Sequence, residues 1–95
     1  MKIQNNGFAK EDKIKFPVDF DLKVIMYTQP DPQISIAELE SLFVQLNIPF
    51  RNWRHKPSGK GTYTSFTVSV HLETQELMTK LYNDLRTVPG VKMAI

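Results

Sequence analysis

The chain has 95 residues, of which 41% are hydrophobic and 23% are charged, and its formal net charge is +2. This length and balance predict one globular domain and exclude a chain that is disordered throughout. Cysteine is absent, which excludes disulfides, thiol nucleophiles and thiolate metal sites, and no apolar run approaches the roughly 20 residues that a membrane span needs.

Residues 1–15 are polar and show no steady periodicity. We expect a flexible tail over this stretch and a single domain over residues 16–95, entered at Phe16-Pro17. Lys2 is not followed by the apolar stretch of a secretory signal. We therefore expect a cytoplasmic protein with no membrane partner.

Residues 20–27 alternate in polarity, which predicts a strand with one buried face. The buried side would consist of Phe20, Leu22, Val24 and Met26. Ile25 and Tyr27 add apolar groups to the other side, which indicates that the outer face is covered or used. Pro30 and Pro32 then end the strand, because proline supplies no ladder donor.

The first helix is expected to begin at Ser35, because Ser35 and Glu38 form the S-x-x-E pattern of a capping box. Ile34 before the cap and Leu39 after it match a hydrophobic staple. The apolar stripe of this helix would be Ile36, Leu39, Leu42, Phe43 and Leu46. Asn47, in a left-handed conformation, would close the helix.

The second half of the chain continues with two strands, a helix and a short strand. Residues 50–56 form a weaker strand whose alternation assigns Trp53 to neither face, and residues 63–73 form the clearest strand. The turn between them contains a proline and two glycines. The second helix is expected between an N-cap at Thr74 and a stop at Pro89-Gly90, before a final strand over residues 91–95.

The resulting order is βαββαβ, and each helix has one apolar stripe. We therefore predict an α+β, ferredoxin-like sandwich: a four-stranded antiparallel sheet of order 4-1-3-2 with both helices on one face. The second strand would lie at an edge of this sheet. Arg51, Arg54 and Lys56 on that strand would then serve to prevent edge-to-edge aggregation, without a further function.

Positive charge gathers at the predicted hairpin. Residues 51–60 hold four of the twelve Lys and Arg residues and none of the ten acids. The candidate ligand- or partner-binding residues are Arg54, Lys56, Ser58, Gly59, Lys60, Gly61 and Tyr63. Their cations and backbone N–H groups would hold a small anionic ligand or a protein partner, and Tyr63 would buttress the hairpin.

No pattern of an enzyme, a metal site or a cofactor site emerges from the sequence. Ser58–Thr62 superficially resembles a phosphate-binding P-loop, but a glycine follows Lys60 and a strand, not a helix, follows the turn. His55 and His71, without cysteine, lack metal-site spacing. We expect no catalytic residue, no metal and no cofactor.

Two other functions stay open. The RNA-recognition motif shares this topology and stacks bases on aromatic residues of its first and third strands. The third strand here offers no aromatic run, so single-stranded nucleic acid is an alternative rather than the expected partner, with Tyr27, Tyr63 and Trp53 as stacking residues. A purely structural homodimer through the open sheet face is the other alternative.

The hairpin motif, which precedes an alternating strand, resembles the YbeD-like family of small bacterial proteins of unknown function. The motif is Lys56-Pro57-Ser58-x-x-Gly61-x-Tyr63-x-Ser65. The resemblance covers roughly residues 16–95. Weaker matches are Phe16-Pro17, Phe20 with Lys23-Val24, Leu81-Tyr82 with Leu85, and Val91-Lys92-Met93. It implies a fold similar to the ACT regulatory domain, which binds small effectors, often amino acids, as a dimer.

Overall fold

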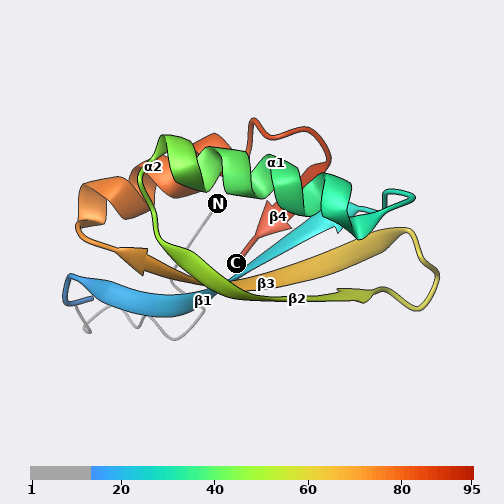
Figure 1. Cartoon of the computed structure of the whole chain (residues 1–95), viewed down its shortest axis with the longest axis horizontal. Helices are drawn as coiled ribbons and strands as arrows, with labels where there is room; N and C mark the ends of the chain where they lie inside the picture. Colours follow the sequence, from blue (N-terminus) through green and yellow to red (C-terminus); the bar gives the residue numbers. More distant parts are fainter. Residues whose placement is uncertain (1–13) are drawn as a thin grey trace.

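The computed structural model describes residues 14–95, which form four strands and two helices in the predicted order. The elements are β1 (Val18–Tyr27), α1 (Pro32–Gln45), β2 (Phe50–Pro57), β3 (Tyr63–Leu72), α2 (Gln75–Leu85) and β4 (Val91–Ala94). All sheet neighbours are antiparallel, in the order β2-β3-β1-β4. Both helices cover the same face of this sheet (Figure 1), which confirms the ferredoxin-like prediction.

The core lies between the helices and the covered face of the sheet. Every second residue of β3 is buried, from Thr64 to Leu72, and β1 buries Leu22, Val24 and Met26 opposite them. The helices contribute Ile36, Leu39, Leu42, Phe43, Met78, Leu81, Tyr82 and Leu85. Complete burial of one such side chain stabilises the fold by about 1.5–3 kcal/mol. The alternating apolar residues of the strands therefore supply much of the free energy that favours this architecture.

Helix α1 begins four residues earlier than the capping-box pattern indicates, because its N-cap is Asp31 and the predicted start at Ser35 is wrong. Asp31 is the N-cap, with extended backbone (φ −125°, ψ 122°), and its Oδ1 accepts a hydrogen bond of 2.9 Å from the N–H of Gln33. Pro32 follows at the first helical position, where its fixed φ suits a helix and its missing N–H costs nothing. Ser35 is consequently buried inside the helix, and the predicted staple residue Ile34 is 46% exposed.

The end of α1 matches the prediction. Asn47 adopts a left-handed conformation with φ of 58°. The N–H of Ile48 donates to the carbonyl oxygen of Phe43 at 2.8 Å, which satisfies one of the last carbonyls of the helix. Thr74 is likewise the N-cap of α2, as predicted, with Oγ1 accepting from the N–H of Leu77 at 3.1 Å.

Strand β2 contains an irregularity that explains its ambiguous alternation. Asn52 has a φ of 62°, and the pairing register with β3 shifts between Arg51 and Arg54. The extra residue reverses the side on which the following side chains lie. Trp53 therefore faces the helices, where its ring packs 6.1 Å from that of Phe43.

The predicted tail lies almost wholly outside the described residues. Of its last residues, Ile14 is partly buried against the core, as is Phe16 at the entry to the domain. Within residues 14–95, neither helix is long and apolar enough to cross a membrane.

Two substitutions distinguish the observed helix start from the expected one. Asp31→Ala removes the N-cap acceptor and should lower the free energy of unfolding by about 0.5–2 kcal/mol. Ser35→Ala should be neutral or slightly stabilising, because the Oγ of Ser35 is buried and has no hydrogen-bond partner among the described residues. Urea denaturation of both variants measures the difference, and the reverse ranking would contradict a cap at Asp31.

Candidate functional site

The β2–β3 turn is built by its own backbone. The N–H of Ser58 donates to the carbonyl oxygen of Tyr63 at 2.7 Å, and the N–H of Gly61 donates to the carbonyl oxygen of Ser58 at 2.9 Å. The Oγ of Ser58 also accepts from the N–H of Tyr63 at 3.3 Å. Gly61 has a φ of +76°, which favours glycine. Ser58 and Gly61 therefore hold the turn in shape, and their own N–H groups already have acceptors.

Three connections meet at this end of the sheet, on the right in Figure 1. The N–H of Thr28, at the start of the β1–α1 loop, donates to the carbonyl oxygen of Thr62 at 3.0 Å. The N–H of Tyr27 donates to the carbonyl oxygen of Gly90 in the turn before β4 at 2.9 Å. The hairpin turn thus lies beside the start of the first helix, as the 4-1-3-2 topology requires.

A shallow trough of about 390 Å³ runs over the middle of β3 on the face away from the helices. Its residues are Asp21, Lys23, Arg54, His55, Lys56, Ser65 and Thr67. The trough is hollow because Ser65 and Thr67 on β3 are small, while long cationic side chains rise from the neighbouring strands. In the sheet register Lys56 lies opposite Ser65, and Thr67 lies between Arg54 and Lys23.

The cations of this surface differ in whether they already have a partner. Arg54 Nη2 lies 3.1 Å from Asp21 Oδ2, with both side chains exposed. Lys23, Lys56 and Lys60 take part in none of the ion pairs formed among residues 14–95. The two lysines of the hairpin therefore keep their charge uncompensated, whereas the arginine of the predicted set is paired.

Asp21 is held in its charged form. The hydroxyl of Ser69 donates to its Oδ1 at 2.8 Å, and this bond, with that from Arg54, lowers the pKa of the Asp21 carboxyl below its ordinary value. The carboxylate therefore forms a fixed negative end to the trough.

Tyr63 packs against Tyr27, its direct partner across the β1–β3 ladder. Their ring centroids are 5.1 Å apart and the ring planes are tilted by 41°. Tyr27 and Lys23 are not among the predicted ligand- or partner-binding residues of the hairpin, although Tyr27 is a predicted stacking residue of the nucleic-acid alternative. Both sit at open-face positions of the first strand, where the alternation of residues 20–27 places them.

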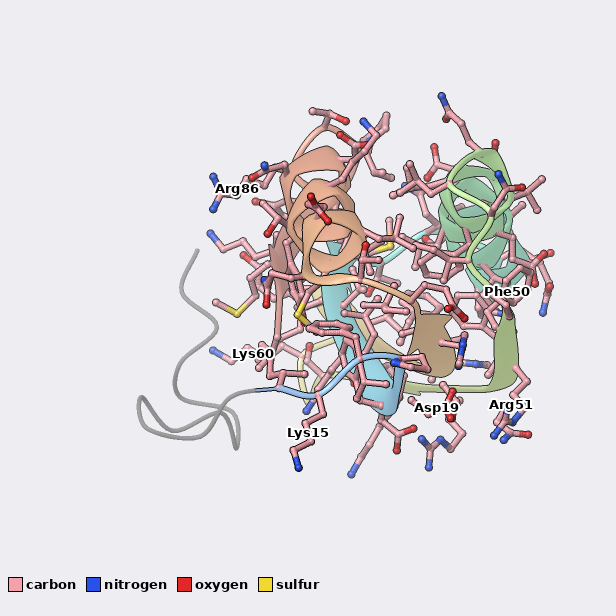
Figure 2. All side chains as sticks on the ribbon, turned by 90° about the vertical axis from the view of Figure 1, so that its left-hand side faces the viewer. Lys15, Asp19, Phe50, Arg51, Lys60 and Arg86 are labelled. Atoms are coloured by element: carbon pink, nitrogen blue, oxygen red, sulfur yellow. The ribbon has the colours of Figure 1, made fainter. Side chains whose placement is uncertain are left out.

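The other end of the open face is acidic. His71 lies between two carboxylates, with Nδ1 2.8 Å from Asp19 Oδ1 and Nε2 2.6 Å from Glu73 Oε2. Hydrogen bonding to Glu73 first, and to Asp19 second, raises the pKa of His71 above its ordinary value. Figure 2 shows Asp19 and Arg51 on the side of the sheet opposite the helices.

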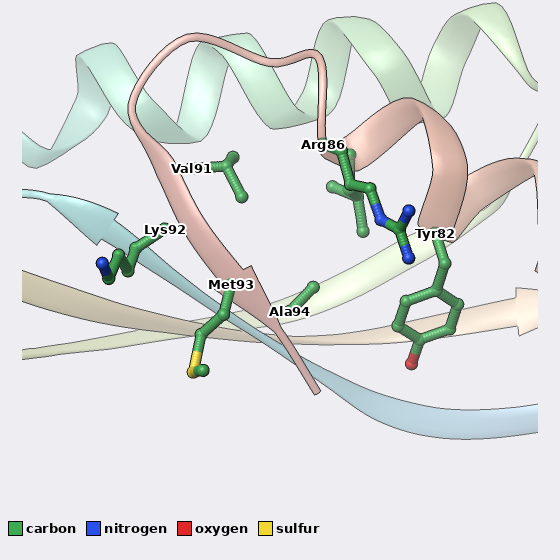
Figure 3. A pocket seen from close by; sticks show the side chains of 7 residues that line it. Tyr82, Arg86, Val91, Lys92, Met93 and Ala94 are labelled. Carbon is green, nitrogen blue, oxygen red and sulfur yellow. The ribbon is translucent and has the colours of Figure 1, made fainter. Parts of the chain in front are cut away.

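A second concavity, of about 380 Å³, lies between α2 and the edge strand β4. It is lined by Tyr82, Leu85, Arg86, Val91, Lys92, Met93 and Ala94. Burial raises the pKa of Tyr82 to about 12, so its hydroxyl stays protonated. Figure 3 shows Arg86 extending toward Tyr82 while Lys92 points away from both, so one cation faces this mostly apolar hollow. The sequence did not indicate this site.

No group of three or more His, Cys, Asp or Glu side chains within residues 14–95 is arranged to hold a metal ion. His55, the other imidazole, lies 5.9 Å from the ring of Phe66. His71 lies instead between Asp19 and Glu73, so the two histidines make no joint site.

Comparison with known proteins places the chain in a family. Residues 11–95 match the family described as "Protein of unknown function (DUF493)". The chain belongs to the DUF493 family. Relatives called UPF0250 proteins include one from Neisseria gonorrhoeae, 34% identical over 90% of this chain and 93% of the relative, and one from Paraburkholderia phymatum, 33% identical over 92% and 97%. The YbeD-like resemblance of the hairpin is thereby confirmed.

Solved structures show the same fold. Protein HP0495 from H. pylori is 20% identical with a TM-score of 0.72, covering 92% of this chain and 90% of that one. The ACT domain from GTP pyrophosphokinase of Chlorobium tepidum is 16% identical with a TM-score of 0.59, covering 82% and 97%. At such identities the likeness concerns the architecture, which is ACT-like in this DUF493 protein.

The acidic end yields a prediction about pH. Because the folded state raises the pKa of His71, its two ion pairs stabilise the fold fully below the ordinary histidine pKa of about 6.5, and this contribution is lost as pH rises through the raised value. An NMR titration in a His55→Gln background would follow the single remaining imidazole. Glu73→Gln should lower the His71 pKa more than Asp19→Asn. Equal pKa values in all three proteins would contradict the contacts.

Proposed function

We propose that this DUF493 protein is a non-catalytic, ACT-like binding module of the bacterial cytoplasm that takes an anionic ligand at its cationic hairpin. The binding residues of this proposal are Arg54, Lys56, Ser58, Gly59, Lys60, Gly61 and Tyr63, joined by Lys23 from β1. An acidic protein surface is the other occupant that the same charges would accept.

The uncompensated charge of Lys56 and Lys60 is the observation that carries the proposal. A cation that serves only to protect a sheet edge from aggregation has to be solvated and requires no other surroundings. Lys56, however, lies at the rim of a trough with small Ser65 on its floor, and Lys60 extends the positive charge into the turn. An anion in the trough would gain charge-assisted hydrogen bonds without first breaking an ion pair of these lysines.

The remaining residues have supporting roles. Ser58 keeps the turn closed through its hydrogen bonds with Gly61 and Tyr63, and the ring of Tyr63 packs against Tyr27. A Cβ atom added at Gly59 would meet no other atom within 4 Å, so the backbone there is open to a ligand. Arg54 would contact the ligand only after its ion pair with Asp21 is broken, so its net contribution to the binding free energy would be smaller.

A regulatory role is supported by position and fold. The hairpin turn is hydrogen-bonded to the loop that starts α1, so a ligand that orders the turn would also order the entry to that helix. The likeness to the ACT domain of a GTP pyrophosphokinase adds a precedent for this architecture inside a larger protein.

A ligand-induced melting screen with phosphate, pyrophosphate, carboxylates and nucleotides, paired with capture of partners from the native cell, tests this function. Lys56→Ala/Lys60→Ala should weaken binding of the ligand found by about 3- to 30-fold, as expected for two exposed ion pairs. Arg86→Ala/Lys92→Ala is the matched control, because it removes the same charge from the other concavity. Equal losses in both double variants would remove the hairpin from the site.

A second candidate is a homodimer through the open face. On that face Tyr27 is 48% and Met93 47% exposed, and Met93 lies opposite half-buried Ile25. If this surface pairs with a second copy, light scattering should give a mass that rises with concentration, and Met93→Lys should abolish the rise. A monomer at the highest soluble concentration would exclude the dimer.

A further inference from the structure

The strongest unassigned feature is the tyrosine pair on the open face. Tyr27 and Tyr63 come from the two central strands, at directly opposite ladder positions, with ring centroids 5.1 Å apart. Tyr27 is 48% exposed although it stands next to another ring. The pair therefore offers an aromatic surface to solvent, at the end of β3 nearest the hairpin turn and next to the trough over Ser65 and Thr67.

Cations continue from this pair along the trough. Lys56 lies opposite Ser65, two positions along β3 from Tyr63, and Arg54 and Lys23 flank Thr67 two positions further. Lys23 is four residues from Tyr27 on β1, which is about 14 Å along the strand. A single row of aromatic and cationic groups therefore follows β3 across half of the sheet.

We propose that this row binds a short segment of single-stranded nucleic acid, with a base stacked on the Tyr27–Tyr63 pair, one phosphate at Lys56 and further phosphate contacts at Arg54 and Lys23 on either side of Thr67. This inference rests on the proposed function and names its ligand. A cationic groove that follows the backbone, beside aromatic side chains that stack bases, is the usual means of binding single strands. From Tyr27 to Lys23 this row is about 14 Å long, and its cations come from two strands, which matches more than one nucleotide better than a single one.

The acidic end limits the length of the bound strand. Asp21 lines the trough beside Lys23, and Asp19 and Glu73 lie beyond it next to His71. These carboxylates would repel a phosphate backbone, so the bound strand should stop near Lys23 and cover about two or three nucleotides. Trp53 takes no part, because it packs on the helix side of the sheet against Phe43.

The binding should depend on salt as expected for a small number of phosphate contacts. Three contacts predict that the logarithm of the association constant falls with a slope of about −2 against the logarithm of salt concentration. Binding should also be tolerant of base identity, because stacking on tyrosine does not read base edges.

Fluorescence anisotropy with fluorescein-labelled octauridylate at low salt tests the proposal on the full chain. Tyr27→Ala should weaken binding by about 5- to 100-fold, the range for loss of one stacked base, and Tyr27→Phe should restore it because the ring returns. Arg86→Ala/Lys92→Ala is the charge control from the far concavity. Thermal melting of each variant checks that it is folded. We expect Tyr27→Ala to fold, because the side chain of Tyr27 is 48% exposed and lies outside the core.

Competition separates this inference from the proposed function. If octauridylate binds and Tyr27→Ala weakens it while Tyr27→Phe does not, the nucleic-acid site is supported. If inorganic pyrophosphate or uridine monophosphate binds as tightly as octauridylate, and Tyr27→Ala has no effect, the hairpin is an anion site and the nucleic-acid inference is overturned. If none of these binds and Lys56→Ala/Lys60→Ala changes no interaction, both proposals fail.

Discussion

The pairing of β1 with β3 is the constraint on which the rest of the structure depends. The two strands are in register over ten residue pairs, from Val18 opposite Leu72 to Tyr27 opposite Tyr63. On the covered face this register stacks Leu22 against Val68 and Val24 against Phe66, all nearly inaccessible to solvent. A shift by one residue would turn this apolar set toward water, so burial specifies the register strongly.

The same register determines the chemistry of the open face. It sets Asp19 beside His71 at one end and Tyr27 beside Tyr63 at the other. Small hydroxyl residues on β3 lie between the longer side chains of β1 and β2, which produces the trough. The face is therefore polarised along the strands, with two carboxylates beside a histidine at one end and two aromatic rings, followed by Lys56, at the other.

One backbone irregularity divides the residues of β2 between the two faces. With Asn52 in the left-handed region, the strand gains a residue relative to β3. Trp53 then packs against Phe43 and donates from Nε1 to Glu40 Oε2 at 2.9 Å, tying the edge strand to α1. Arg54, the next residue, reaches the open face and pairs with Asp21. The bulge thus lets one short strand both anchor in the core and supply a cation to the trough.

The sequence by itself determined the element order, the faces of β1 and β3, the stop of α1 at Asn47 and the cap of α2 at Thr74. These features depend on alternation and on local hydrogen bonds, which are readable within a few residues. It also located the positive charge at the hairpin.

Tertiary structure decided what local patterns leave open: the choice of Asp31 over Ser35 as the cap, the face of Trp53, and the partners of the charged groups. Asp21 and Arg54 are 33 residues apart in the chain, and Tyr27 and Tyr63 meet only when two central strands pair in one register. Such contacts depend on the pairing of distant strands and on a bulge, and neither can be predicted from local propensity. The reason is that burial of the core on the opposite face of the sheet stabilises this pairing.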